Sequence, residues 1–158
     1  METGRILHFA AGLQRLALPL SEVREIAEVR SLVSVHGAPA IVGGLAEIRG
    51  RVVTVLDPAT GGAAPEAGPA QPSAPLFAVI FREPFDHLGV LVRGVPETAD
   101  ALEVTDPAES GGRPGAGSWI AEGREILLSG GRRASLLEPR RLADHASRCV
   151  RAQFMVVS

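Results

Sequence analysis

Residues Ile41 to Asp57 read IVGGLAEIRGRVVTVLD and carry the clearest structural pattern in this chain of 158 residues. Gly43 and Gly44 open the run, Arg49 and Gly50 interrupt it, and β-branched residues follow. Glycine adopts the positive φ of a tight turn without strain, and β-branched residues favour strands. The pattern predicts a strand entered from a glycine turn, with an arginine at the turn. It shows no catalytic pattern and is typical of a surface to which another protein binds.

Two patterns recur along the chain in the same order. The run Arg15 to Leu20 is echoed by His87 to Val92, and the run Arg51 to Pro58 is echoed by Arg132 to Pro139. Chance could produce one such similarity. It explains less well two similarities that occur in the same order. The repeats therefore predict two similar subdomains, with the second pair of runs at equivalent positions.

Short strands separated by turns account for most of the chain, and this arrangement is typical of small barrels. A short helical turn is expected within residues 39–48. The fold class is therefore mainly β. Strands are expected at 6–10, 15–20, 25–29, 51–56, 76–81, 88–93, 102–104, 119–121, 125–128 and 133–137.

We expect one domain over residues 1–158, with a first barrel over roughly 15–58 and a second over roughly 76–138. The N-terminal strand 6–10 joins a barrel edge. Residues 59–75, rich in Ala, Pro and Gly, are expected to form a mobile loop, since they have little apolar surface to bury. Pro139 opens a helix, and residues 150–157 alternate in a way that fits a final strand or a frayed end.

Composition excludes several functional classes. The net charge of −2 gives no general attraction to nucleic acid or to an anionic membrane. No apolar run approaches the roughly 20 residues of a membrane span, and the N-terminus lacks the pattern of a secretory signal. Cys149 is the only cysteine, which excludes an internal disulfide and fits a reducing cytoplasm.

Catalytic and metal-binding patterns are missing from the sequence. The four histidines lie far apart, and none has a second ligand at metal spacing. Asp86 and His87 are adjacent, so on a strand they would point to opposite faces. The chain has no lysine, which excludes a Schiff-base or phosphate-loop lysine. We therefore expect no enzyme activity, no metal and no cofactor.

The first half of the chain resembles the signature of CheW-like proteins, the coupling proteins of bacterial chemosensory arrays. The resemblance rests on Val23-x-Glu25-Ile26, on Ile41-Val42-x-Gly44, and on the run from Ile48 to Asp57. The segments 89–95 and 120–142 resemble the second half of the family, so the similarity covers roughly residues 5–148. Membership implies two SH3-like five-stranded barrels related by a pseudo-twofold, with short helices including one near the C-terminus.

The resemblance also implies a role. CheW-like proteins have no activity of their own and link the cytoplasmic tip of a methyl-accepting chemoreceptor to the regulatory domain of a CheA-like histidine kinase. The receptor hairpin lies along an apolar groove between the barrels. Such a protein is cytoplasmic and is recruited to receptor arrays. Carried over to this chain, the partner-binding positions are Val23, Glu25, Ile26, Gly44, Arg49 and Gly50.

Two departures from the family pattern add secondary candidates. Glu47 stands where the family usually has asparagine, and Arg93 stands where it usually has aspartate. Such changes of charge alter the choice of partner, which leaves three readings. The chain is an adaptor of receptor and kinase, a divergent module that binds only one of them and modulates signalling, or a small β-barrel enzyme or ligand-binding protein.

Overall fold

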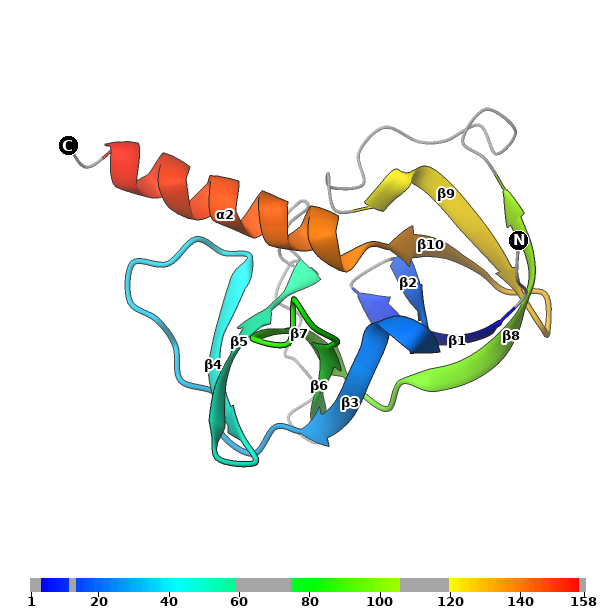
Figure 1. Cartoon of the computed structure of the whole chain (residues 1–158), viewed down its shortest axis with the longest axis horizontal. Helices are drawn as coiled ribbons and strands as arrows, with labels where there is room; N and C mark the ends of the chain where they lie inside the picture. Colours follow the sequence, from blue (N-terminus) through cyan, green and yellow to red (C-terminus); the bar gives the residue numbers. More distant parts are fainter. Residues whose placement is uncertain (1–3, 12–13, 59–74, 106–119, 157–158) are drawn as a thin grey trace.

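The computed structural model describes residues 4–11, 14–58, 75–105 and 120–156, with the backbone alone for 102–105, 120–124 and 153–156. Within these residues the chain is mainly β and ends in one long helix (Figure 1). The elements are β1 (Arg5–Ala11), β2 (Gln14–Pro19), η1 (Leu20–Glu22), β3 (Val23–Glu28), β4 (Val42–Ile48), β5 (Arg51–Leu56), β6 (Leu76–Phe81), β7 (Leu88–Arg93), β8 (Glu97–Thr105), β9 (Ile120–Leu128), β10 (Arg133–Leu137) and α2 (Pro139–Val156).

The strands form two five-stranded sheets. One sheet is a closed barrel in the order β1-β2-β10-β9-β8, which we call the closed barrel. The other has the order β3-β6-β7-β5-β4, and its two outer strands are not joined by a ladder; we call it the open sheet. The expected fold, mainly β with two five-stranded subdomains, is confirmed.

The two sheets share one strand order. In the open sheet the hairpin β4–β5 lies beside β7 with β5 parallel to it, and β6 joins β7 to β3. In the closed barrel the hairpin β9–β10 lies beside β2 with β10 parallel to it, and β1 joins β2 to β8. The two runs 51–58 and 132–139 begin in or beside β5 and β10, so they occupy equivalent positions in separate sheets, as the sequence repeat predicts.

Sheet membership divides the chain differently from the expected ranges of 15–58 and 76–138. The open sheet is built from the continuous segment 23–93, whereas the closed barrel combines strands from 5–19 and 97–137. The strand expected over 6–10 lies inside the closed barrel, between β2 and β8, and not at an edge. Local sequence patterns do not report such long-range pairing, because pairing depends on which apolar faces meet in the core.

Two expectations for local structure need correction. Within residues 39–48 only the start forms a turn, in which the amide of Val42 donates to the carbonyl of Pro39. Residues 42–48 form strand β4, because Gly44, Ala46 and Ile48 are buried in alternation with more exposed neighbours. Residues 150–156 continue helix α2, because extending a formed helix adds one hydrogen bond for each residue fixed. The expected loop over 59–75 lies, apart from its last residue, outside the described residues.

Three apolar clusters stabilise the arrangement. The largest lies between the two sheets, and its fully buried aromatic side chains are Phe9 of β1 and Phe81 of β6. Smaller clusters fill the interior of the open sheet and of the closed barrel. Since the largest cluster takes residues from both sheets, the two subdomains share their core.

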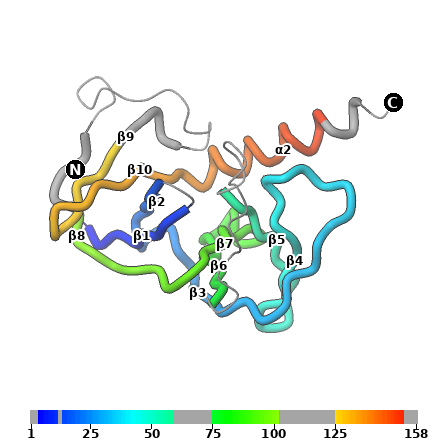
Figure 2. Tube along the Cα trace, turned by 180° about the vertical axis from the view of Figure 1, so that it is seen from behind, coloured from blue at the N-terminus to red at the C-terminus, as the bar shows by residue number. Residues whose placement is uncertain are grey.

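Helix α2 continues from β10 and runs above β5 and β4 of the open sheet (Figure 2). Its first turns bury Leu142 and Ala146 in the shared core. Strand β1 and the end of α2 lie at opposite ends of the molecule (Figure 1). Among the described residues, no helix has both the length and the apolarity that crossing a membrane requires.

Candidate functional site

The predicted glycine turn is the two-residue connection between β4 and β5. Ile48 pairs with Arg51, and between them Arg49 and Gly50 both have positive φ, at 52° and 78°. Two successive positive φ angles are the pattern of a type I′ turn, which suits the twist of a hairpin. Glycine adopts this conformation freely, whereas an arginine there is strained by about 1–2 kcal/mol. Arg49 is the only non-glycine residue with positive φ among the described residues.

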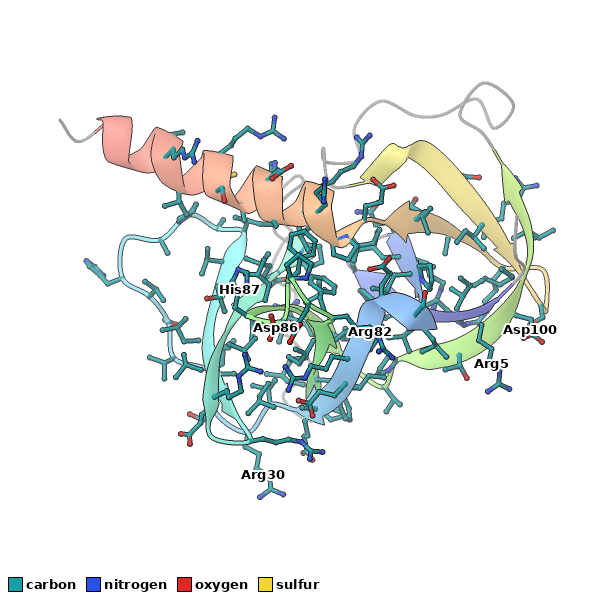
Figure 3. The ribbon with its side chains drawn as sticks, in the orientation of Figure 1. Arg5, Arg30, Arg82, Asp86, His87 and Asp100 are labelled. Carbon is teal, nitrogen blue, oxygen red and sulfur yellow. The ribbon has the colours of Figure 1, made fainter. Side chains whose placement is uncertain are left out.

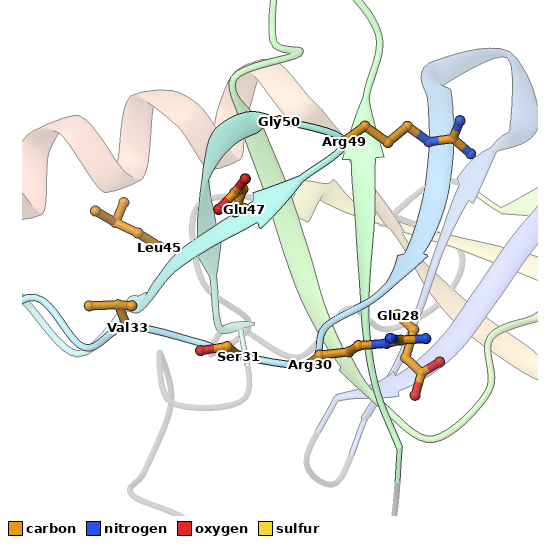
Figure 4. Close-up of a pocket in the computed structure, with 8 residues that line it drawn as sticks. All are labelled: Glu28, Arg30, Ser31, Val33, Leu45, Glu47, Arg49 and Gly50. Carbon is orange, nitrogen blue, oxygen red and sulfur yellow. The ribbon is translucent and has the colours of Figure 1, made fainter.

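Arg49 pairs with Glu25 across the outside of the open sheet. Its Nε lies 2.8 Å from Oε2 of Glu25 on β3, while 82% of the Arg49 side chain remains exposed. Figure 4 shows the Arg49 side chain extending away from Glu47. The ion pair therefore joins the β4–β5 turn to β3 and presents a guanidinium at the surface.

The other two predicted positions on β3 have different environments. Val23 is buried in the core between the sheets, whereas Ile26 is one of the large hydrophobic side chains exposed to solvent. A shift in register between Val23 and Glu25 marks a β-bulge in the pairing of β3 with β6. Bulges redirect side chains and are often placed next to functional sites. Ile26 can therefore contact a partner directly, while Val23 supports the strand from behind.

The two predicted glycines also differ. A Cβ at Gly44, where φ is 151°, would lie 2.6 Å from the carbonyl oxygen of Val33. A Cβ at Gly50 would meet no atom within 4 Å. Gly44 thus permits a close approach between β4 and the segment that precedes it, whereas Gly50 serves the turn alone.

Glu47, Arg49 and Gly50 line a hollow of about 380 Å³ at the edge of the open sheet (Figure 4). The remaining lining residues come from the end of β3, from the segment after it and from β4: Glu28, Arg30, Ser31, Val33 and Leu45. The structure therefore brings the secondary candidate Glu47 together with the turn, although its side chain does not pair with Arg49.

Arg93, the other secondary candidate, lies apart from this group. It ends β7, and its guanidinium donates two hydrogen bonds to the carboxylate of Asp57, at 2.8 and 3.2 Å. Because β5 and β7 are parallel, Asp57 lies at the opposite end of β5 from Arg49, ~20 Å away for six residues. The hydrogen bonding of Arg93 to Asp57, in which Arg93 donates, raises the pKa of Arg93 above its usual value. Arg93, whose charge is opposite to that of the aspartate usual in the family, is thus paired with Asp57 within the protein.

A charged cluster that the sequence did not predict lies beside β3 and β5. Asp86, which is labelled in Figure 3, lies next to His87 in the chain. It accepts hydrogen bonds from Nη1 of Arg24 at 3.2 Å and from Nη2 of Arg51 at 3.0 Å. The hydrogen bond from Arg51 lowers the pKa of Asp86 below its usual value. The three residues are far apart in the sequence, so no spacing pattern reveals them. Asp86 thus binds arginines and does not form the acid–base pair with His87 that their adjacency brings to mind.

A second hollow, of about 330 Å³, separates α2 from the open sheet. Leu56, Leu88 and Val42 line one side, and Ala143, Ala146 and Val150 of α2 line the other. His87 and Arg151 also contribute to its lining. Its lining comes from α2 and from the open sheet with its β6–β7 connection, and not from the closed barrel, so it differs in position from the groove between the barrels that the family resemblance implies.

The histidines do not form a metal site within the described residues, where no group of three or more potential ligands is close enough to hold an ion. His8 is buried in β1, and Nη1 of Arg15 lies 2.9 Å from its Nδ1. Burial, and next the positive charge of Arg15, lower the pKa of His8. Because a guanidinium can only donate, Nδ1 accepts the hydrogen bond from Arg15. We interpret His8 as a residue that stabilises the barrel.

Comparison with known proteins gives a consistent result. The family model of the CheW-like domain matches residues 5–147. The crystal structure of the scaffolding protein TtCheW from Thermoanaerobacter tengcongensis is similar, with a TM-score of 0.65 and 14% sequence identity over 87% of this chain and 90% of that one. No curated protein sequence matches the chain. The structural likeness, at this identity, concerns the fold.

Proposed function

Because this chain belongs to the CheW-like domain family, we propose that it is a non-enzymatic adaptor of bacterial chemosensory signalling. In this role it binds the cytoplasmic tip of a methyl-accepting chemoreceptor and the regulatory domain of a CheA-like histidine kinase. It acts in the cytoplasm and joins receptor arrays there. The observation that supports a binding role most directly is the exposed Arg49 guanidinium, oriented by Glu25 on a strained turn.

The chemistry of the site suits a protein partner. Arg49 offers charge-assisted hydrogen bonds, and Ile26 adds exposed apolar surface on the neighbouring strand. Arginine is enriched among the residues that dominate binding energy in protein interfaces. Strained backbone is also found most often where function requires it. Glu25 positions the arginine, while Gly44 and Gly50 shape the strand and turn that carry it.

A binding measurement on Arg49→Ala tests the proposed contact. We expect the affinity for a receptor signalling fragment to fall by about 1–2 kcal/mol if Arg49 is an interface anchor. Arg49→Lys should restore little of this loss if the partner carboxylate is held by two parallel hydrogen bonds. Arg30→Ala is the matched control, because Arg30 is exposed beside the same hollow. Unchanged affinity in a folded Arg49→Ala variant would exclude this contact.

A co-purification experiment separates coupling from one-sided binding. An adaptor should recover both a receptor fragment and a kinase regulatory domain from the same organism, and a modulator should recover one alone. The internal pairing of Arg93 with Asp57, where the family usually has aspartate, is the feature that favours a modified partner surface. The variant Arg93→Asp then tests which of the two partners is affected.

A further inference from the structure

The two sheets differ at one seam. In the closed barrel, β8 pairs directly with β9, from Ala101 opposite Leu128 to Thr105 opposite Glu125. The equivalent strands of the open sheet, β3 and β4, share no ladder. Val33, in the segment after β3, forms a single bridge to Leu45 of β4. The hollow of about 380 Å³ lies in this interrupted seam.

Backbone groups on both sides of the seam point into it. Directly after β3, the amide of Val29 donates to the carbonyl of Leu76, so Val29 is bonded toward β6. Antiparallel ladders alternate, and the peptide groups of its neighbour Glu28 therefore point away from β6. On β4, the two-residue turn makes Ile48 and Arg51 a hydrogen-bonded pair, so the peptide groups of Glu47 point away from β5.

The side chains around the seam define what fits there. Val33 is 61% exposed and, with Leu45, offers an apolar contact. Glu28 and Glu47 contribute carboxylates, and neither has an ion-pair partner among the described residues. Arg49 is bound to Glu25, which leaves Arg30 as the other charge at the hollow. The lining is thus apolar at one end and carries two glutamates and two arginines along the strand edges, of which Arg49 is already paired with Glu25.

We propose that this seam binds an extended peptide segment of a partner protein, which adds a strand between β3 and β4. The segment would exchange main-chain hydrogen bonds with Glu28 and Glu47, as strand-addition complexes do. It would carry an aliphatic side chain toward Val33 and Leu45 and a lysine or arginine toward the two glutamates. The occupant differs from the helical receptor hairpin of the proposed function, so either proposal can fail alone.

The test uses peptides selected from a phage-displayed library on the full-length protein, with dissociation constants of the synthetic peptides measured by fluorescence polarisation. Glu47→Pro removes the amide that faces the seam, and proline is tolerated at such outward positions of an edge strand. Glu47→Ala is the matched control, because it keeps the amide and removes only the carboxylate. We expect proline to weaken binding about tenfold or more and alanine about threefold.

Hydrogen exchange of the wild-type protein gives a second measurement that does not depend on the folding of the proline variant. The selected peptide should slow exchange at the amides of Glu28 and Glu47. Three results would overturn the proposal. No peptide could be selected, the folded Glu47→Ala and Glu47→Pro variants could lose the same affinity, or exchange at both amides could remain unchanged. Val95→Ala, at an exposed side chain outside the hollow, should retain peptide binding and is the surface control.

Discussion

The closed barrel and the open sheet have the same strand order, and they differ at one pair of strands. The pair is β8 and β9 in the closed barrel and β3 and β4 in the open sheet. In the closed barrel the two strands pair, and that part of the surface has no exposed strand edge. In the open sheet the residues between β3 and β4 diverge, touch β4 at one bridge and leave a hollow beside the strained turn. The candidate binding residues lie on the subdomain that departs from closure.

The strand ends show a second difference. Strands β5 and β10 are each followed by an acid and a proline. Asp57 is only 5% exposed and is held by Arg93 of the same sheet, whereas Glu138 is 40% exposed and binds Arg141 of α2. Asp57 therefore stabilises the open sheet, and Glu138 stabilises the start of helix α2. Equivalent sequence positions thus serve different contacts.

The shared core gives the largest expected effect. Phe81→Ala should lower the free energy of unfolding by about 3–5 kcal/mol, because Phe81 is fully buried between the sheets. Denaturant unfolding should remain a single transition, and exchange should accelerate in both sheets. Val52→Ala, at a side chain that is 67% exposed, should change stability by less than about 0.5 kcal/mol. Two separate transitions would show that the sheets fold independently.

The bridge between Val33 and Leu45 in the open sheet gives the next largest expected effect on stability. Gly44→Ala should destabilise the protein by about 2–4 kcal/mol, because it combines an unfavourable φ with a clash against the Val33 carbonyl. Gly50→Ala should destabilise it by about 1–2 kcal/mol, since the space at Gly50 is open and only the backbone is strained. Thermal melts of both variants measure the difference. Equal losses would mean that the contact with Val33 contributes nothing.

The acids after β5 and β10 give a smaller contrast. Arg93→Ala should lower stability by about 1.5 kcal/mol, the low end for hydrogen bonds to a charged group, because Arg93 is partly exposed. Arg141→Ala should lower it by about 0.5 kcal/mol or less, as for other pairs on a helix surface. Urea unfolding of the two variants provides the comparison. A larger loss for Arg141→Ala would reverse the assignment of roles.

His8 distinguishes the closed barrel by its response to pH. Burial and Arg15 lower the pKa of His8 below 6.5, so on acidification the unfolded chain binds a proton before the folded protein does. Stability should therefore fall as the pH decreases below 6.5. The variant His8→Gln should flatten part of this dependence, and His145→Gln a further part, because burial also lowers the pKa of His145. An unchanged pH profile in the His8 variant would contradict this origin.

Much of this organisation is visible in the sequence, because it is local. The β-branched run in 51–56 and the glycine turn at Arg49 and Gly50 predict a strand entered from a turn, which the structure contains. The echoing runs predict equivalent strands, which the pairing confirms. By contrast, the cluster of Arg24, Arg51 and Asp86 depends on how three distant segments meet. The same holds for the joining of β1 and β2 to β8–β10, because these strands lie far apart in the sequence.

The smallest expected effect concerns Arg49 itself and separates its ion pair from its backbone strain. Arg49→Ala and Arg49→Gly both remove the pair with Glu25, which is exposed and contributes about 0.2–1 kcal/mol. Alanine keeps the strain of positive φ, whereas glycine relieves about 1 kcal/mol of it. The glycine variant should therefore match the wild-type stability within about 0.5 kcal/mol and exceed that of the alanine variant. Chemical denaturation of the three proteins measures this order. If glycine and alanine were equally stable, the turn would carry no strain, and the conformation of Arg49 would not be a feature retained for binding.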